Sequence, residues 1–325
     1  MRVLAADVGG TKTALGLYES NQAGDYRTLQ EQIYPSSGPS LSALLHRFLS
    51  SSDSDARIDV AVLSVAGPVE AGVCNTTNLP WTLSEVELTR ELRAPTKLIN
   101  DFHAVAIGVS MLGPAELRVL QVGRRDPTAP YAVIGAGTGL GEAVAVPMGA
   151  QICVLPGEGG HADFAPRNEI EMRLLRFLQT QTDHVSVERV VSGMGMGALY
   201  DFVVADGLAA DDPETRARFA EGESRGAVIS ERAALDPAAA RTLALFVSAY
   251  GAAAGNLALK VLPRGGMYVA GGIAARLAEQ LDWNLFMQNF LAKGRMSELL
   301  ESIPVSVVLN ANVGLVGARA YAALR

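Results

Sequence analysis

The stretch "VLAADVGGTKTALGLY", Val3–Tyr18, decides the fold because it joins two strand patterns through a glycine turn. An apolar run carries one acid, Asp7, immediately before the turn Gly9-Gly10-Thr11, and alternating apolar residues follow it. A second stretch, "YAVIGAGTGLGEAVAV" (Tyr131–Val146), has the same plan without the acid. One such hairpin at the head of each half predicts a duplicated architecture rather than a short-period repeat array.

The patterns that follow each hairpin have the same order in both halves. In the first half we expect strands at Val3–Val8, Thr13–Tyr18, Thr28–Ile33, Ile58–Val65 and Lys97–Ile99, with helices at Leu41–Leu49 and after Asp101. In the second half we expect strands at Tyr131–Ala136, Gly141–Val146, Gln151–Val154, Met267–Ala270 and Val305–Leu309. Asp236-Pro237 opens a helix, Asp206–Arg225 is expected to be exposed, and Val313–Ala323 is expected to form a last helix packed back on the first half.

Composition narrows the class of protein. The 325 residues are 49% apolar and 19% charged, which is typical of a globular chain that buries a sizeable core. The 27 basic and 34 acidic residues give a net charge of −7 without a basic block, which argues against a nucleic-acid partner. Cys74 and Cys153 are far apart, so neither a disulfide framework nor a zinc site is indicated. No signal-peptide region and no apolar segment long enough to cross a bilayer are recognised, so we expect a cytoplasmic protein with no membrane partner.

The glycine hairpins are candidate phosphate sites. Neighbouring glycines allow the backbone to approach a ligand closely, and the exposed amides of such a turn suit phosphate oxygens, with Thr11 and Thr138 adding hydroxyls. The alternative is a tight β-turn without a ligand, but two matching hairpins in two matching halves favour a nucleotide. Other phosphate motifs fail, because the chain has no Gly-Lys dipeptide and the Rossmann spacing at Gly193, Gly195 and Ala198 follows a poor strand.

Asp7 is a candidate Mg²⁺ partner, directly or through water, because an acid beside phosphates is costly unless a cation lies between them. Its alternative role is to cap the turn by hydrogen bonds to the backbone. A third glycine turn, Gly271-Gly272, follows the strand Met267–Ala270, and its small residues would let an adenine or ribose lie against the backbone.

Two further motifs suggest a second, hydroxyl-rich substrate. "LINDFHAVAIG" places Asn100 and Asp101 where a strand ends and a helix begins, so Asp101 is either an ordinary N-cap or a fixed general base. "LPGEGGHADFAP" places Glu158 and His161 among glycines, where they could grip two neighbouring hydroxyls. Glu188 is either a third polar arm or a solvated charge at a helix end.

These residues together carry a resemblance. The chain resembles the bacterial ATP-dependent glucokinases of the actin–hexokinase–heat-shock ATPase superfamily over essentially its full length. The motifs are "ADVGGTKTALGLY", "VAGPV", "TNLPW", "LIND", "GAGTGLG", "LPGEGGHADFAP" and "AGGI".

The resemblance implies the fold, reaction and site. The fold would be α/β, with two duplicated ribonuclease H-like domains, residues 1–111 plus 313–325 and residues 112–312, and an active-site cleft between them. The reaction would transfer the γ-phosphoryl group of Mg·ATP to the 6-hydroxyl of glucose, with Asp101 as base. Glucose would be held by Asn100, Asp101, Glu158, His161 and Glu188. ATP and Mg²⁺ would be held by Ala6, Asp7, Val8, Gly9, Gly10, Thr11, Gly137, Thr138, Gly139, Gly271 and Gly272.

The resemblance also implies a homodimer. The sister group of sugar kinases and repressors carries a cysteine-rich zinc motif that this chain lacks after His161, so no zinc is expected. Three alternatives stay open at this point: a kinase for mannose or fructose, an acetate-type kinase, and a sugar-sensing regulator without enzymatic activity. Two extra acids in the acceptor site disfavour an anionic acceptor. The net charge and the absence of a DNA-binding extension before the first strand disfavour a regulator.

Overall fold

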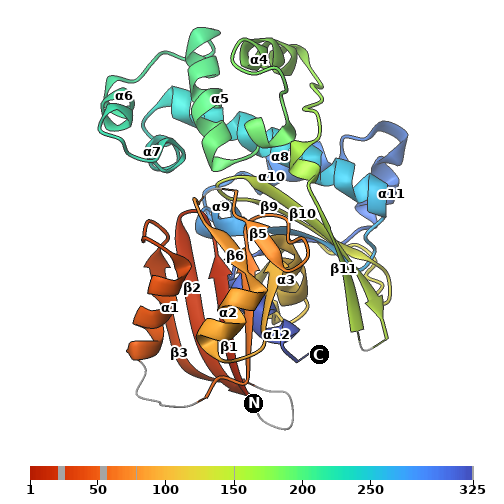
Figure 1. Cartoon of the computed structure of the whole chain (residues 1–325). Coiled ribbons are helices and arrows are strands. Elements are labelled where there is room, and N and C mark those ends of the chain that lie inside the picture. Colours follow the sequence, from red (N-terminus) through yellow and green to blue (C-terminus); the bar gives the residue numbers. More distant parts are fainter. Residues whose placement is uncertain (21–25, 52–56, 78, 150, 324–325) are drawn as a thin grey trace. The chain divides into compact units, whose positions relative to one another are not determined.

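The computed structural model describes residues 1–20, 26–51, 57–77, 79–149 and 151–323 (Figure 1). Its contacts divide the chain into two units, which are described separately. Unit 1 comprises Met1–Glu116, Pro147–Pro156 and Asn310–Arg325, and unit 2 comprises Leu117–Val146 and Gly157–Leu309. Asn78 of the "TNLPW" motif and the last two residues of the chain lie outside the described residues.

Unit 1 contains a five-stranded sheet in the order β3-β2-β1-β4-β7. Its strands are β1 (Arg2–Val8), β2 (Lys12–Ser20), β3 (Tyr26–Pro35), β4 (Val60–Val65) and β7 (Thr96–Asn100). The hairpin β1–β2 is antiparallel with Asp7 opposite Ala14, whereas β4 runs parallel to both β1 and β7. A short ribbon of β5 (Val73–Asn75) and β6 (Thr82–Ser84) follows β4. The five expected strands of the first half are thus confirmed.

Helices cover both faces of this sheet because successive side chains of each strand point to opposite faces. Leu4 and Ala6 of β1 pack with α1 (Leu41–Ser50) and α2 (Glu85–Leu92). Val3 and Ala5 pack on the other face with α3 (Asp101–Val109) and α12 (Val313–Tyr321). The expected last helix therefore exists, and it packs on the strands that begin the chain (Figure 1).

The second sheet has six strands in the order β11-β10-β9-β12-β13-β8, and it belongs to unit 2 except for the end of β10 and most of β11, which lie in the Pro147–Pro156 segment of unit 1. β9 and β10 form the second antiparallel hairpin, β12 runs parallel to β9 and β13, and β8 is antiparallel to β13. The strands are β8 (Leu117–Gln121), β9 (Tyr131–Ala136), β10 (Leu140–Met148), β11 (Gln151–Gly157), β12 (Gly266–Ala270) and β13 (Val305–Val308). The sheet therefore repeats the arrangement of a hairpin followed by parallel strands and adds one antiparallel edge strand.

The helices of unit 2 share one large apolar core with this sheet. They are α4 (Glu169–Gln179), α5 (Gly193–Ala205), α6 (Pro213–Ala220), α7 (Arg225–Arg232), α8 (Pro237–Val261), α9 (Gly271–Arg276), α10 (Trp283–Leu291) and α11 (Ser297–Glu301). Single 3₁₀ turns lie at Pro114–Glu116, Gly159–His161, Val187–Arg189 and Gly294–Met296.

One expectation about these helices was wrong, and another was confirmed with one exception. The 25 residues of α8 are long and apolar enough to span a membrane, contrary to the sequence reading, but 72% of its most apolar window is buried within unit 2, as in a core helix. The segment Asp206–Arg225 is largely exposed, as expected, although it contains α6 and buries Thr215 completely. The hydroxyl of Thr215 donates to the buried carboxylate of Asp236 at 2.8 Å, and this partner is not visible in the local pattern.

Candidate active site

The first hairpin turn, Gly9-Gly10-Thr11, is fixed from beneath by Ser36, which the sequence analysis did not single out. The Gly9 amide closes the turn on the Lys12 carbonyl at 3.0 Å. The buried Ser36 hydroxyl donates to the Gly9 carbonyl at 2.7 Å, and the Ser36 amide donates to the Thr11 carbonyl at 3.0 Å. Thr11 is exposed and both glycines are partly exposed, so the turn is held on its inner side and accessible on its outer side.

Asp7 lies directly before this turn, between the fully buried Ala6 and Val8. The Ser64 hydroxyl donates to its Oδ1 at 2.9 Å, and Gly314 packs against the carboxylate. A Cβ on Gly314 would lie 2.7 Å from Oδ2, so a residue with any side chain could not occupy this position unchanged.

Burial raises the pKa of Asp7 above its usual value, and the Ser64 hydrogen bond and the Lys12 charge offset this only in part. A buried carboxylate with so little compensation is costly to ionise unless a cation binds it. Among the described residues no cluster of three or more His, Cys, Asp or Glu side chains could hold a metal. A single carboxylate nevertheless fits Mg²⁺, which typically keeps several waters and completes its shell with substrate phosphates.

Asn100 and Asp101 stand at the end of β7, but their local roles differ from the simpler sequence reading. Asn100, not Asp101, is the N-cap of α3, since its Oδ1 accepts from the amides of Phe102 at 2.9 Å and His103 at 3.2 Å. Asp101 is the first helical residue, and its Oδ1 accepts from the Phe102 amide at 2.9 Å. The hydrogen bond fixes the carboxylate, and the N-terminus of a helix is a position that favours a negative charge.

The "VAGPV" motif supports this pair from a neighbouring strand end. The Asn100 side-chain amide donates to the Gly67 carbonyl at 3.3 Å, and Gly67 has φ +143°, which a side chain would not tolerate. Cys74 is fully buried, and burial, with a smaller effect of the Asp101 charge, raises the pKa of its thiol. Cys74 is therefore a packing residue beside Asp101 rather than a reactive thiol.

In unit 2, Glu158 and His161 lie on an exposed loop. Their side chains are 62% and 56% exposed, and His161 Nε2 is 3.9 Å from a Glu158 carboxylate oxygen. The glycines between them pack on β10, because a Cβ on Gly160 would lie 3.1 Å from the Leu140 carbonyl carbon. The loop backbone is thus held while both polar side chains remain available to a ligand.

Glu188 is not the solvated end charge considered above. Its Oε2 accepts from the Leu140 amide at 2.8 Å, and Gly139 leaves room for the carboxylate, whose carbon would lie 3.1 Å from an added Cβ. The Val187 amide donates to the Ala162 carbonyl at 2.9 Å, and Asp163 and Ser186 form a β-bridge. The structure therefore brings Glu188 and the loop of Glu158 and His161 together at the second hairpin.

The second hairpin turn, Gly137-Thr138-Gly139, also lies beside the turn at Gly271-Gly272, whose two glycines are the first residues of α9. Gly271 has φ +88°, and an added Cβ would lie 2.5 Å from the Ala136 carbonyl oxygen. Gly137 and Gly272 have open space where their side chains would be. Gly271 packs so closely on Ala136 that only glycine fits there, whereas the space beside Gly137 and Gly272 is open. A flat ligand group could therefore lie directly against the backbone.

The residues Gly193, Gly195 and Ala198 belong to α5, which follows a 3₁₀ turn rather than a strand, so rejecting them as a Rossmann motif was correct. The sequence analysis nevertheless missed Gly193, whose amide donates to the Gly137 carbonyl at 2.8 Å and ties α5 to the second hairpin turn.

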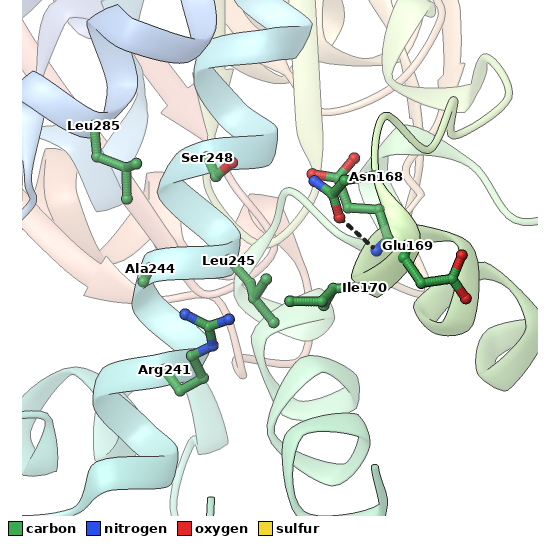
Figure 2. A pocket seen from close by; sticks show the side chains of 9 residues that line it. Asn168, Glu169, Ile170, Arg241, Ala244, Leu245, Ser248 and Leu285 are labelled. Atoms are coloured by element: carbon green, nitrogen blue, oxygen red, sulfur yellow. Dashed lines mark hydrogen bonds between the residues drawn. The ribbon is translucent and has the colours of Figure 1, made fainter. Parts of the chain in front are cut away.

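Figure 2 shows a separate pocket of about 420 Å³ in unit 2, and none of the predicted site residues lines it. Its only buried acid, Glu171, is neutralised by an ion pair with Arg167. Because the Glu171 carboxylate is already paired with Arg167, this pocket is a weaker candidate for a catalytic site than the glycine turns. The lining residues are Asn168, Glu169, Ile170, Glu171, Arg241, Ala244, Leu245, Ser248 and Leu285.

Comparison with known proteins matches the family model of glucokinase to residues 4–325. The chain belongs to the glucokinase family. It is 43% identical to a glucokinase of Nostoc sp. over 337 aligned residues, covering 99% of this chain and 98% of the relative. Membership of the glucokinase family makes this chain an ATP-dependent hexose kinase, a transferase.

Two solved structures share the fold. A glucokinase from an Antarctic psychrotroph is 32% identical, with a TM-score of 0.81 and coverage of 100% of this chain and 99% of the other. A ROK family glucokinase from Streptomyces griseus, solved with glucose and AMPPNP, has a TM-score of 0.67 at 19% identity, with 98% of each chain covered. The second likeness concerns the fold alone.

Proposed function

We propose that this glucokinase-family chain transfers the γ-phosphoryl group of Mg·ATP to the 6-hydroxyl of glucose, with Asp101 as the base. The observation that carries the proposal is the placement of Asp101 as the first residue of α3, at the carboxyl end of β7. Ligands of α/β proteins gather at such strand ends. The 43% identity to the glucokinase of Nostoc sp. supports glucose as the acceptor.

The acceptor site would consist of Asn100, Asp101, Glu158, His161 and Glu188. The carboxylates accept hydrogen bonds from sugar hydroxyls, and the His161 ring bonds a neighbouring hydroxyl. Glu188 uses Oε2 for the Leu140 amide, so Oε1 is the oxygen we assign to the sugar. The carboxylates would repel an anionic acceptor, which favours a neutral hexose.

The nucleotide would lie along the glycine turns. The amides of Gly9, Gly10 and Thr11, and those of Gly137, Thr138 and Gly139, would donate to phosphate oxygens, while Gly271 and Gly272 would pack against the nucleoside. Ala6 and Val8 are buried and would contribute by fixing Asp7. Asp7 would hold Mg²⁺ directly or through water, and the ion when bound neutralises charge on the phosphates.

The proton would pass from the glucose 6-hydroxyl to Asp101 as the hydroxyl oxygen attacks the γ-phosphorus in line with the departing ADP oxygen. The helix terminus favours a negative charge at Asp101, which suits a carboxylate that accepts this proton. Backbone amides of the turns would stabilise the charge that spreads over the transferred group, and they need no rearrangement to do so.

We also propose the wider architecture that this reaction needs. The domains would be residues 1–111 plus 313–325 and residues 112–312, two duplicated ribonuclease H-like copies with the active site in a cleft between them. The shared order of hairpin and parallel strands in the two sheets supports the duplication. The protein would act in the cytoplasm as a homodimer, without zinc.

Asp101→Asn tests the proposal, because it keeps the size of the side chain and removes the base. We expect kcat to fall by about 10²- to 10⁴-fold while the Kd for glucose stays within about threefold. Glu169→Gln is a matched control, since Glu169 is also the first residue of a helix after an asparagine cap. It should leave kcat unchanged. An Asp101→Asn variant that keeps more than about a tenth of kcat would refute the base assignment.

A panel of glucose, mannose, fructose and acetate as acceptors tests the substrate. Glucose should give the highest kcat/KM and acetate none, because the acceptor site carries carboxylates. A higher kcat/KM for another hexose would replace glucose in the proposal.

A further inference from the structure

Tyr250 is a fully buried residue of α8 whose hydroxyl reaches the end of the sheet in unit 2. The hydroxyl accepts from the Ala136 amide at 3.0 Å, and its single proton lies within donating reach of the carbonyl oxygens of Ile134 and Ala270, each 3.3 Å from the phenol oxygen. These residues belong to β9 and β12, so one phenol oxygen contacts the ends of both strands.

The Tyr250 hydroxyl lies where the hydrogen-bond ladder between β9 and β12 ends. The parallel pairing of β9 and β12 ends at Gly135 opposite Ala270. Beyond this pair the chain leaves the ladder at Gly271, and the Ala136 amide donates to the Tyr250 hydroxyl. Tyr250 supplies this acceptor, so its hydroxyl replaces one further rung of the ladder.

The ring has little freedom to move. Phe246 and Phe286 pack on it with ring-centroid distances of 5.6 and 5.4 Å, the second in edge-to-face geometry. Burial raises the pKa of the Tyr250 phenol, so it keeps its proton and can donate and accept at once. A fixed ring with a protonated hydroxyl makes a rigid spacer between the two strand ends.

The two strand ends lead directly into the turns that would hold the nucleotide. Ala136 precedes the second hairpin turn, and Ala270 precedes the Gly271-Gly272 turn. We infer that Tyr250 is a positioning residue for the nucleotide, because its hydroxyl fixes the distance between the phosphate turn and the nucleoside turn. This inference rests on the proposed function, since it takes those turns as the nucleotide site.

Tyr250→Phe is the direct test, because it removes one oxygen and keeps the packed ring. The Ala136 amide then lacks its acceptor, and the two turns lose their common anchor. We expect the Kd for Mg·ADP, measured by calorimetry without turnover, to rise about tenfold, and the Kd for glucose to change less than twofold.

Tyr200→Phe is the matched control. Tyr200 is also fully buried in unit 2, and its hydroxyl donates to Asp236 at 2.9 Å and accepts from the Asp212 amide at 3.3 Å. This variant should lower the melting temperature without changing the Kd for Mg·ADP. An equal loss of nucleotide affinity in both variants would show a general effect of destabilisation and would overturn the inference.

The outcomes separate the inference from the function on which it rests. If wild-type protein binds Mg·ADP and Tyr250→Phe binds it equally well, the inference alone fails. If wild-type protein binds no Mg·ADP, the proposed function and the inference fail together.

A measurement on the wild type covers the case in which the variant does not fold. Mg·ADP should slow hydrogen exchange in residues 131–139 and 266–273 together, and protection of only one segment would contradict a common anchor.

Discussion

Gly317→Ala would test how closely α3 and α12 cross in unit 1. A Cβ on Gly317 would lie 2.6 Å from the Ala104 carbonyl carbon and 2.9 Å from the Gly108 amide nitrogen. On the facing helix, a Cβ on Gly108 would lie 2.9 Å from a Val313 methyl carbon. The Ala104 carbonyl oxygen would lie nearer still, and ordinary contact begins at 3.4 Å, so the helix backbones would have to move apart.

Two effects of opposite sign decide the result. Alanine is a better helix former than glycine by about 1 kcal/mol, which alone would stabilise the variant. Overpacking against backbone atoms, which cannot rotate away, costs about 3 kcal/mol. We therefore expect the free energy of unfolding to fall by about 2 kcal/mol and the melting temperature by about 4–8 °C.

Thermal and urea unfolding followed by circular dichroism measure this change. Gly272→Ala is a stability control, because Gly272 is also helical but an added Cβ would meet nothing within 4 Å. Because α3 begins at Asp101 and Gly314 of α12 packs on Asp7, Gly317→Ala should also lower kcat. A Gly317→Ala protein as stable as wild type, or more stable, would refute the reasoning.

Three further predictions concern one buried acid and two half-buried ones. Burial raises the pKa of Glu142, so wild type should lose stability as pH rises from the unfolded-state pKa near 4.5 through the folded-state value. Glu142→Gln should then have a higher urea midpoint than wild type at pH 7.5 and an equal one at pH 4, and a lower midpoint at pH 7.5 would contradict this. Asp236→Ala should lower the free energy of unfolding by about 3 kcal/mol, because the Asp236 carboxylate caps α8 and accepts hydrogen bonds from Tyr200 and Thr215. A loss below about 1 kcal/mol in urea unfolding would contradict this. Without ligand at neutral pH, Asp7→Asn should have a higher melting temperature than wild type, because burial disfavours the charge of Asp7. In calorimetry, Mg²⁺ should no longer strengthen the binding of ADP to this variant. Retained Mg²⁺ dependence would argue against Asp7 as its partner.

Local chemistry in the sequence predicted much of the fold. The apolar runs and glycine turns located both hairpins, and the change from strand to helix pattern located Asn100 and Asp101 at the end of β7. The same reasoning failed on which residue caps α3. Asparagine and aspartate are both good caps, and only the backbone conformation decided that Asn100 accepts the helix amides.

Partners distant along the chain could not be predicted in this way. Glu188 looks like an end charge until the Leu140 amide, 48 positions away, is brought to it. Tyr250 is one more apolar position of a core helix until its hydroxyl meets the Ala136 amide, 114 positions away. Asp7 likewise gives no sign in the sequence that Gly314 will pack against its carboxylate.

The sequence by itself therefore determined the two hairpins, the main strands that follow them and the residue types proposed for the site, because periodicity and turn chemistry act over a few residues. Only the tertiary structure decided which groups contact those residues and in which direction burial shifts their pKa values. Hydrogen bonding and desolvation depend on atoms that approach in space, and a raised pKa such as that of Asp7 exists only once the chain has closed around it.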